Sequence, residues 1–401
     1  MSNFNRRHFL YFASSTLATL GINQLTFLQQ AQNYGQVLAK STSRKLALLI
    51  GINQYLHEPL AGCLNDIELQ RHLLIHRFGF NPKDIYILTD QKATRQGILE
   101  AFEEHLIKQA KPGDVVAYHY SGHGSRIFDP QPIMRTNQHP RHPKELNGTF
   151  VPIDAELPPG YPEAGGSVID IMGHTLYLLM SALKTENVTV TLDSCFAGGA
   201  TRDAVVRTRP GGKNILVSPL EKAYQQQWLK RLQMSPEEFV KGYRKGVAKG
   251  VVLAATQQQQ LAREVNVNGF HAGVFTYLLT NYLWQQDSTV DKAIAAIIPE
   301  VPRTFNQTPT YEVKPDSDYT NQQLFFIKNP APIGNAVITE VKGNKVKLWL
   351  GGVEDLGTID VGTIFNVVGG NGTVKIVNRI GLVGEATAEG NLKEGMILSQ
   401  I

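Results

Sequence analysis

The chain has 401 residues, of which 42% are hydrophobic and 18% are charged. That composition is typical of a globular protein with a sizeable core, and the length suits two or three domains. The formal net charge is only +4, and Lys and Arg form no run interleaved with aromatic residues, which argues against a nucleic-acid-binding protein. Because the only cysteines are Cys63 and Cys195, the fold does not depend on a disulfide framework, although a single bridge stays open.

Residues 1–40 have the features of an export signal. The segment 6–10 reads Arg-Arg-His-Phe-Leu, the order found in twin-arginine signals, and a moderately apolar stretch follows at 11–22. That stretch is too short to cross a membrane, which takes about 20 apolar residues. We expect export to the periplasm or its equivalent. A cytoplasmic protein that keeps the extension is the alternative.

From Lys45 onward, short apolar runs that suit buried strands alternate with segments of helical periodicity. The predicted strands are 46–50, 85–88, 114–118, 188–192 and 250–255. The predicted helices are 66–77, 94–110, 168–184, 224–232 and 272–284. This alternation predicts the α/β class, with a mostly parallel sheet flanked by helices. Residues 126–147, rich in Pro, His and Arg, are expected to form a surface loop.

The pattern changes after Pro332. Short strand-like runs separated by Gly-containing turns occur at 336–339, 346–350 and 373–377. They predict a small all-β, barrel-like domain at 333–401. A strand-rich extension of the main sheet is the alternative.

Two chemical motifs follow predicted strands. His123 follows the third strand and Cys195 follows the fourth. Because ligands bind at the carboxyl ends of parallel strands, we expect both side chains in one cleft. A thiolate is a strong nucleophile, and an imidazole can take its proton and later protonate the leaving amine. The backbone N–H groups of Gly124 and Cys195 are candidates for binding the oxyanion. Taken singly, each side chain could also be an ordinary packed residue.

These motifs resemble the two catalytic boxes of metacaspases and their bacterial relatives, the orthocaspases. The boxes are 120–124 and 192–198, and further similar blocks lie at 62–66, 149–154, 254–257, 271–276 and 307–309. The resemblance implies a caspase-like cysteine peptidase that acts through a thioester. It places the peptidase domain at 41–330, with a large-subunit part at 41–207 and a small-subunit part at 245–330.

The resemblance also implies a preference for cleavage after Arg or Lys. The positions that match the family's basic-residue pocket are Asp66, Ser121 and Asp193. Carboxylates beside the nucleophile would hold a cationic side chain and repel an acidic one. Asp66 could alternatively be a helix N-cap. The expected partner is a peptide or protein with Arg or Lys before the scissile bond, and we expect a monomer.

Many members of the family need calcium, held by acidic residues that include a run of consecutive acids. At the matching place this sequence has Asp170 alone, between Ile169 and Ile171. Because a hard cation wants several oxygen ligands, we predict that the protein needs no metal or other cofactor.

A basic stretch lies where the family separates its two subunits. It contains Arg202, Arg207 and Arg209. We expect self-cleavage after one of them, with Arg207 as the first choice, and a solvated basic loop is the alternative. Two other functions stay open: a pseudo-peptidase that acts as a regulatory binding module, and a gingipain- or clostripain-type peptidase.

Overall fold

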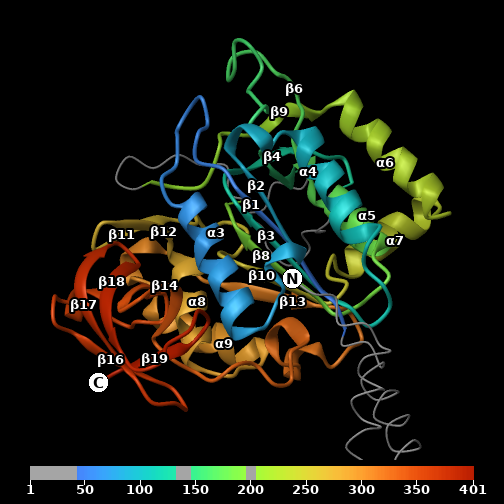
Figure 1. Ribbon diagram of the computed structural model, residues 1–401. Coiled ribbons are helices and arrows are strands. Elements are labelled where there is room, and N and C mark those ends of the chain that lie inside the picture. Colours follow the sequence, from blue (N-terminus) through green and yellow to red (C-terminus); the bar gives the residue numbers. More distant parts are fainter. Residues whose placement is uncertain (1–42, 132–145, 196–204) are drawn as a thin grey trace, which may run out of the picture. The chain divides into compact units, whose positions relative to one another are not determined.

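The computed structural model describes residues 43–131, 146–195 and 205–401 (Figure 1). Within it, Lys45–Ile401 cluster as one unit. The proposed export signal at 1–40 and the cleavage candidate Arg202 lie outside the described residues. In the described ranges, no helix has the length and apolar character needed to span a membrane.

A six-stranded sheet organises the first part of the chain. Its order is β13-β10-β8-β3-β1-β2. All pairs from β10 to β2 are parallel, and β13 is added antiparallel at the edge. The α/β class with a mostly parallel sheet is therefore confirmed. The bounds are β1 Lys45–Gly51, β2 Ile85–Thr89, β3 Val115–Ser121, β8 Val188–Asp193, β10 Val251–Ala254 and β13 Thr310–Val313.

Helices cover both faces of this sheet (Figure 1). In β1, Leu46, Leu48 and Ile50 belong to one hydrophobic core, whereas Ala47 and Leu49 belong to another, as expected for a strand buried on both sides. The first core contains α4 Arg95–Ala101, α5 Gly173–Ala182, α6 Pro219–Arg231 and α7 Pro236–Lys245. The second contains α3 Cys63–His72, α8 Val274–Gln285 and α9 Val290–Ile297.

Local signals explain several helix boundaries. Thr94 caps α4 by accepting a hydrogen bond from the Gly97 N–H, and Ser235 forms a capping box at the start of α7. Two predicted helices continue as π-helical segments, Leu73–Arg77 after α3 and Phe102–Ile107 after α4. The helix predicted at 168–184 begins only at Gly173, because the residues before it form two short strands.

Those two strands belong to a second, five-stranded sheet of order β6-β9-β4-β5-β7. The prediction of a loop at 126–147 was wrong at both ends, because β4 and β5 pair antiparallel and bury alternate side chains. β9 runs parallel to β4. The bounds are β4 Gly124–Phe128, β5 Leu146–Phe150, β6 Gly166–Val168, β7 Ile171–Met172 and β9 Gly212–Val217. A separate hairpin pairs β11 Glu264–Val267 with β12 Phe270–Gly273.

The C-terminal residues form a closed six-stranded antiparallel barrel, as predicted. A strand-rich extension of the main sheet was the wrong alternative, because within the described ranges the barrel strands pair only with one another. α8 contacts the barrel through Asn281, whose amide donates to the Val353 carbonyl over 2.7 Å. The bounds are β14 Ala336–Lys342, β15 Lys345–Trp349, β16 Ile364–Val367, β17 Thr373–Ile380, β18 Val383–Glu389 and β19 Ile397–Gln400.

Candidate active site

Two neighbouring strands of the main sheet carry the candidate catalytic residues. β3 and β8 are parallel and in register, with Ser121 opposite Asp193, so His123 and Cys195 both follow the carboxyl end of the sheet. A Cβ atom added at Gly124 would overlap the carbonyl oxygen of Cys195. The two motifs therefore meet backbone to backbone, and only glycine fits at this contact.

The imidazole of His123 has a defined orientation. Its Nε2 lies 2.7 Å from the Glu58 carbonyl oxygen, which can only accept, so Nε2 carries the proton. Nδ1 is buried without a hydrogen-bond partner and is free to act as a base. Burial lowers the pKa of His123 to about 4, so the ring is neutral at ordinary pH. The Tyr55 hydroxyl accepts from the His123 N–H over 2.9 Å, which fixes the backbone.

The Cys195 thiol is fully buried. Its Sγ accepts a hydrogen bond from the Ala262 N–H over 2.8 Å and lies 3.4 Å from the Ala262 carbonyl oxygen. Burial raises the pKa of Cys195 to about 12. The site therefore holds a neutral thiol and a neutral imidazole, and a nucleophile forms only when a base takes the proton. Cys63 and Cys195 are both free, so the possible bridge is not formed.

Residues 205–209 pass through this site, where Val206 forms a β-bridge with Arg263 and Thr208 forms one with Gly124. The Arg207 N–H donates to the Ala262 carbonyl over 3.0 Å. The Arg207 carbonyl oxygen accepts from the N–H groups of Gly124 and Cys195, each over 3.0 Å. These are the two donors that the sequence predicted for an oxyanion, and here they bind the carbonyl of the predicted cleavage residue.

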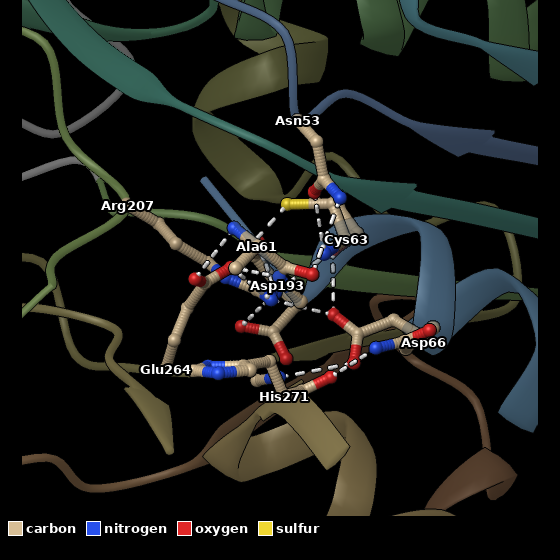
Figure 2. Close-up of polar contacts among 12 residues, drawn as sticks. Asn53, Ala61, Cys63, Asp66, Asp193, Arg207, Glu264 and His271 are labelled. Carbon is tan, nitrogen blue, oxygen red and sulfur yellow. Dashed lines mark hydrogen bonds and ion pairs between the residues drawn. The ribbon is translucent and has the colours of Figure 1, made fainter. Parts of the chain in front are cut away.

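The Arg207 side chain fills a closed polar pocket (Figure 2). Its Nη2 forms ion pairs with Asp66 Oδ2 at 2.7 Å and Glu264 Oε1 at 3.1 Å. Its Nη1 forms an ion pair with Asp193 Oδ1 at 3.0 Å and donates to Ser121 Oγ over 2.8 Å. All three residues predicted for the basic-residue pocket thus surround one guanidinium, together with Glu264, which the sequence analysis missed.

The carboxylates of this pocket favour the charged form of Arg207, and Arg207 favours theirs. Burial opposes the charge on Arg207, but Asp193 and Asp66 outweigh it and raise its pKa. Burial raises the pKa of Asp66 to about 7, with Arg207 opposing. Burial also acts to raise the pKa of Glu264, but Arg207 and two backbone N–H groups lower it overall. The pocket is therefore built around a cation.

Several interpretations from the sequence are corrected here. Asp66 is not a helix N-cap, because Gly62 occupies that position of α3 and Asp66 lies in the first turn. Arg207 and Arg209 are buried, so the solvated basic loop was the wrong alternative for both. Glu264 lies in an ordinary short strand, and no sequence motif marks it; only the hairpin β11-β12 brings it to the pocket.

Asp170, expected where the family has its acidic run, is completely buried. Its carboxylate accepts hydrogen bonds from both terminal nitrogens of the Arg209 guanidinium and from the Thr149 hydroxyl. Among the described residues, no three side chains of His, Cys, Asp or Glu gather as a metal site.

A cysteine and a histidine at adjacent strand ends of an α/β fold are the two kinds of side chain that a cysteine nucleophile and its base require. Residues 45–203 match the family described as metacaspase, peptidase C14 domain. Over these residues the chain is similar to the metacaspase peptidase C14 domain, and it is a distant homologue of the metacaspases, a family of cysteine endopeptidases.

Curated metacaspases are similar to part of this chain. Metacaspase-1 of Schizosaccharomyces pombe is 33% identical over 178 residues, which cover 42% of this chain and 37% of the relative. Metacaspase-9 of Arabidopsis thaliana is 30% identical over 183 residues, covering 44% and 50%. The chain thus spans at most half the length of these two relatives. A crystal structure of a Geobacter sulfurreducens protein superposes with a TM-score of 0.46 and 20% identity, over 71% of this chain and 99% of that one.

Proposed function

We propose that this protein is a cysteine endopeptidase that cleaves after Arg or Lys, with Cys195 as nucleophile and His123 as base. We further propose that its first substrate is its own Arg207–Thr208 bond. The observation that carries the proposal is the position of Arg207: its guanidinium is surrounded by carboxylates while its carbonyl oxygen accepts from Gly124 and Cys195.

We propose the following reaction, which these contacts support. Nδ1 of His123 takes the thiol proton, and the Cys195 sulfur adds to the carbonyl carbon of Arg207. The oxyanion that forms is stabilised by the N–H groups of Gly124 and Cys195. When the C–N bond breaks, the imidazolium gives its proton to the amine of Thr208. Water then hydrolyses the thioester, which yields the Arg207 carboxylate and restores the thiol.

The same pocket favours arginine over lysine as the residue before the bond. The two terminal nitrogens of Arg207 contact different partners, Nη1 with Asp193 and Nη2 with Glu264. A planar guanidinium can satisfy both sides at once, whereas an ammonium is a single compact charge. We therefore expect both residues to be accepted, with arginine preferred.

Activity is proposed to be independent of calcium, because Asp170 already pairs with Arg209. A chelator is then expected to leave peptide hydrolysis unchanged, and activity that vanishes with the chelator and returns with calcium would contradict this. We also propose a monomer that is exported by the twin-arginine route, on the basis of residues 6–10. Cell fractionation of the wild type beside an Arg6→Lys, Arg7→Lys variant tests the export.

The decisive experiment compares the wild type with Cys195→Ala, each expressed alone, with Arg303→Ala as a surface control. Wild type and control are expected to yield two fragments, the second starting at Thr208, while Cys195→Ala stays intact. The processed wild type is expected to release a fluorophore from Arg- and Lys-ending peptides but not from Asp-ending ones. Processing in the Cys195→Ala protein, or no activity on Arg and Lys peptides, would reject the proposal and favour a regulatory module without catalysis.

A further inference from the structure

A second buried guanidinium lies two residues beyond the proposed scissile bond. Arg209 Nη1 donates to Asp170 Oδ1 over 2.8 Å, and Nη2 donates to Oδ2 over 2.7 Å. Nη1 also donates to the Ala155 carbonyl over 2.9 Å. The Thr149 hydroxyl donates to the same carboxylate, to Oδ2 over 2.6 Å. This arrangement is a shaped receptor for one guanidinium.

The backbone around Arg209 is bound as a peptide strand. Its N–H donates to the Gly124 carbonyl over 2.9 Å, and Thr208 pairs with Gly124 in a parallel bridge. The Ser125 hydroxyl donates to the Pro210 carbonyl over 3.3 Å. The residues that follow the proposed bond therefore lie along β4, and they continue into β9, which is also parallel to β4.

We propose that Asp170, Thr149 and the Ala155 carbonyl form a second arginine-binding subsite, on the leaving-group side of the bond, and that Arg209 fills it. This inference rests on the proposed function and deepens it. The ligand class is the guanidinium of a peptide whose arginine stands two residues after the cleaved bond.

The chemistry of the subsite selects a guanidinium. Asp170 is fully buried, and a buried carboxylate without a cationic partner is strongly disfavoured. The two parallel N–H···O bonds match the planar fork of arginine, which an ammonium or a neutral side chain cannot reproduce.

The subsite also decides which product stays. Hydrolysis adds water across the bond, leaving a carboxylate on Arg207 and an amine on Thr208. Arg209 belongs to the product that carries the new amine, and the hydrogen bonds of its guanidinium to Asp170 and to the Ala155 carbonyl do not involve the cleaved bond. The new amino terminus therefore remains along β4, where it competes with the leaving-group side of any other substrate.

The test uses two internally quenched peptides that share an arginine before the bond and differ two residues after it, with Arg in one and Ala in the other. The full-length enzymes are the wild type, Arg209→Ala, Arg209→Ala with Asp170→Asn, and the surface control Arg303→Ala. Arg209→Ala, whose subsite is vacant, is expected to cleave the Arg peptide with a kcat/KM about tenfold above that for the Ala peptide. The other three enzymes are expected to show a ratio near one, because Arg209 fills the subsite or the carboxylate is gone.

An Arg-ending fluorogenic substrate, which has no residue after the bond, separates two kinds of failure. If the wild type does not hydrolyse it, the proposed function fails. If Arg209→Ala hydrolyses it but cleaves both peptides equally, the second subsite is rejected.

Arg209→Ala leaves the buried Asp170 without a cation and could fail to fold. Arg209→Lys is therefore a second variant, because it keeps a cation beside Asp170. Its self-cleavage is expected to be about fivefold slower than that of an Arg303→Lys control, since the bidentate contact is lost. Equal rates would also overturn the inference.

Discussion

The two buried arginines on either side of the proposed scissile bond are held in different ways. Arg207 is held by partners on four separate elements: Asp66 on α3, Ser121 on β3, Asp193 on β8 and Glu264 on β11. Arg209 depends on one carboxylate, Asp170, with help from a carbonyl. The first pocket has three carboxylates around its guanidinium, so we expect it to tolerate the loss of one. The pocket of Arg209 has a single carboxylate, so the loss of Asp170 would leave its guanidinium without an ion pair.

The largest effect is expected from a substitution that obstructs the Arg207 pocket and leaves the Arg209 pocket unchanged. A Cβ atom at Gly273 would overlap Asp193 Oδ2 and lie 2.5 Å from Arg207 Nη1. Gly273→Ala is therefore expected to slow self-cleavage about a hundredfold or more, because small displacements at the reacting centre are costly. Time courses of fragment formation measure this, with Gly357→Ala, whose nearest neighbour is a side-chain oxygen, as the control. A normal rate in Gly273→Ala would show that Arg207 does not need this pocket to react.

A milder change removes one of the three carboxylates. Glu264→Gln is expected to lower kcat/KM for Arg peptides about tenfold, because Asp66 and Asp193 still hold the guanidinium. The effect on Lys peptides should be smaller, since a compact ammonium cannot reach all partners at once. The measured quantity is the ratio of the two kcat/KM values. The Glu264 carboxylate also accepts hydrogen bonds from the N–H groups of Ala61 and Gly62. An unchanged ratio would mean that Glu264 only stabilises this loop.

The smallest effect concerns pH, and it compares the site before and after cleavage. In the uncleaved chain burial lowers the pKa of His123 to about 4, with Glu264 opposing and Arg207 and Arg209 assisting. Because the neutral ring is the base, single-turnover self-cleavage should stay constant as pH falls until about 4 and decline only below it. Once Arg207 has left and water enters, the pKa should return toward its ordinary value, so peptide hydrolysis should decline at a higher pH. Acid limbs at the same pH in the two assays would contradict this.

Much of the fold was predictable because its signals are local. Continuous apolar runs marked the buried strands, and the switch to short runs with Gly-containing turns after Pro332 marked the barrel. The strands that were missed have other patterns. β13 is only half-buried along its length, and β4 and β5 lie beside a stretch rich in Pro and Arg. Neither pattern resembles a continuous apolar strand.

The sequence by itself predicted the two candidate reactive side chains, their strand-end positions and the basic stretch that contains Arg207, because each lies in a short contiguous motif. The resemblance to metacaspases added Asp66, Ser121 and Asp193 as the expected basic-residue pocket. Only the tertiary structure decided where the described part of that stretch lies, with Arg207 among the carboxylates and Arg209 paired with Asp170. Glu264 and the Glu58 carbonyl joined the site in the same way. The physical reason is that these contacts join residues distant in the chain. Their ion pairs and hydrogen bonds form only when folding brings the groups together and removes them from water.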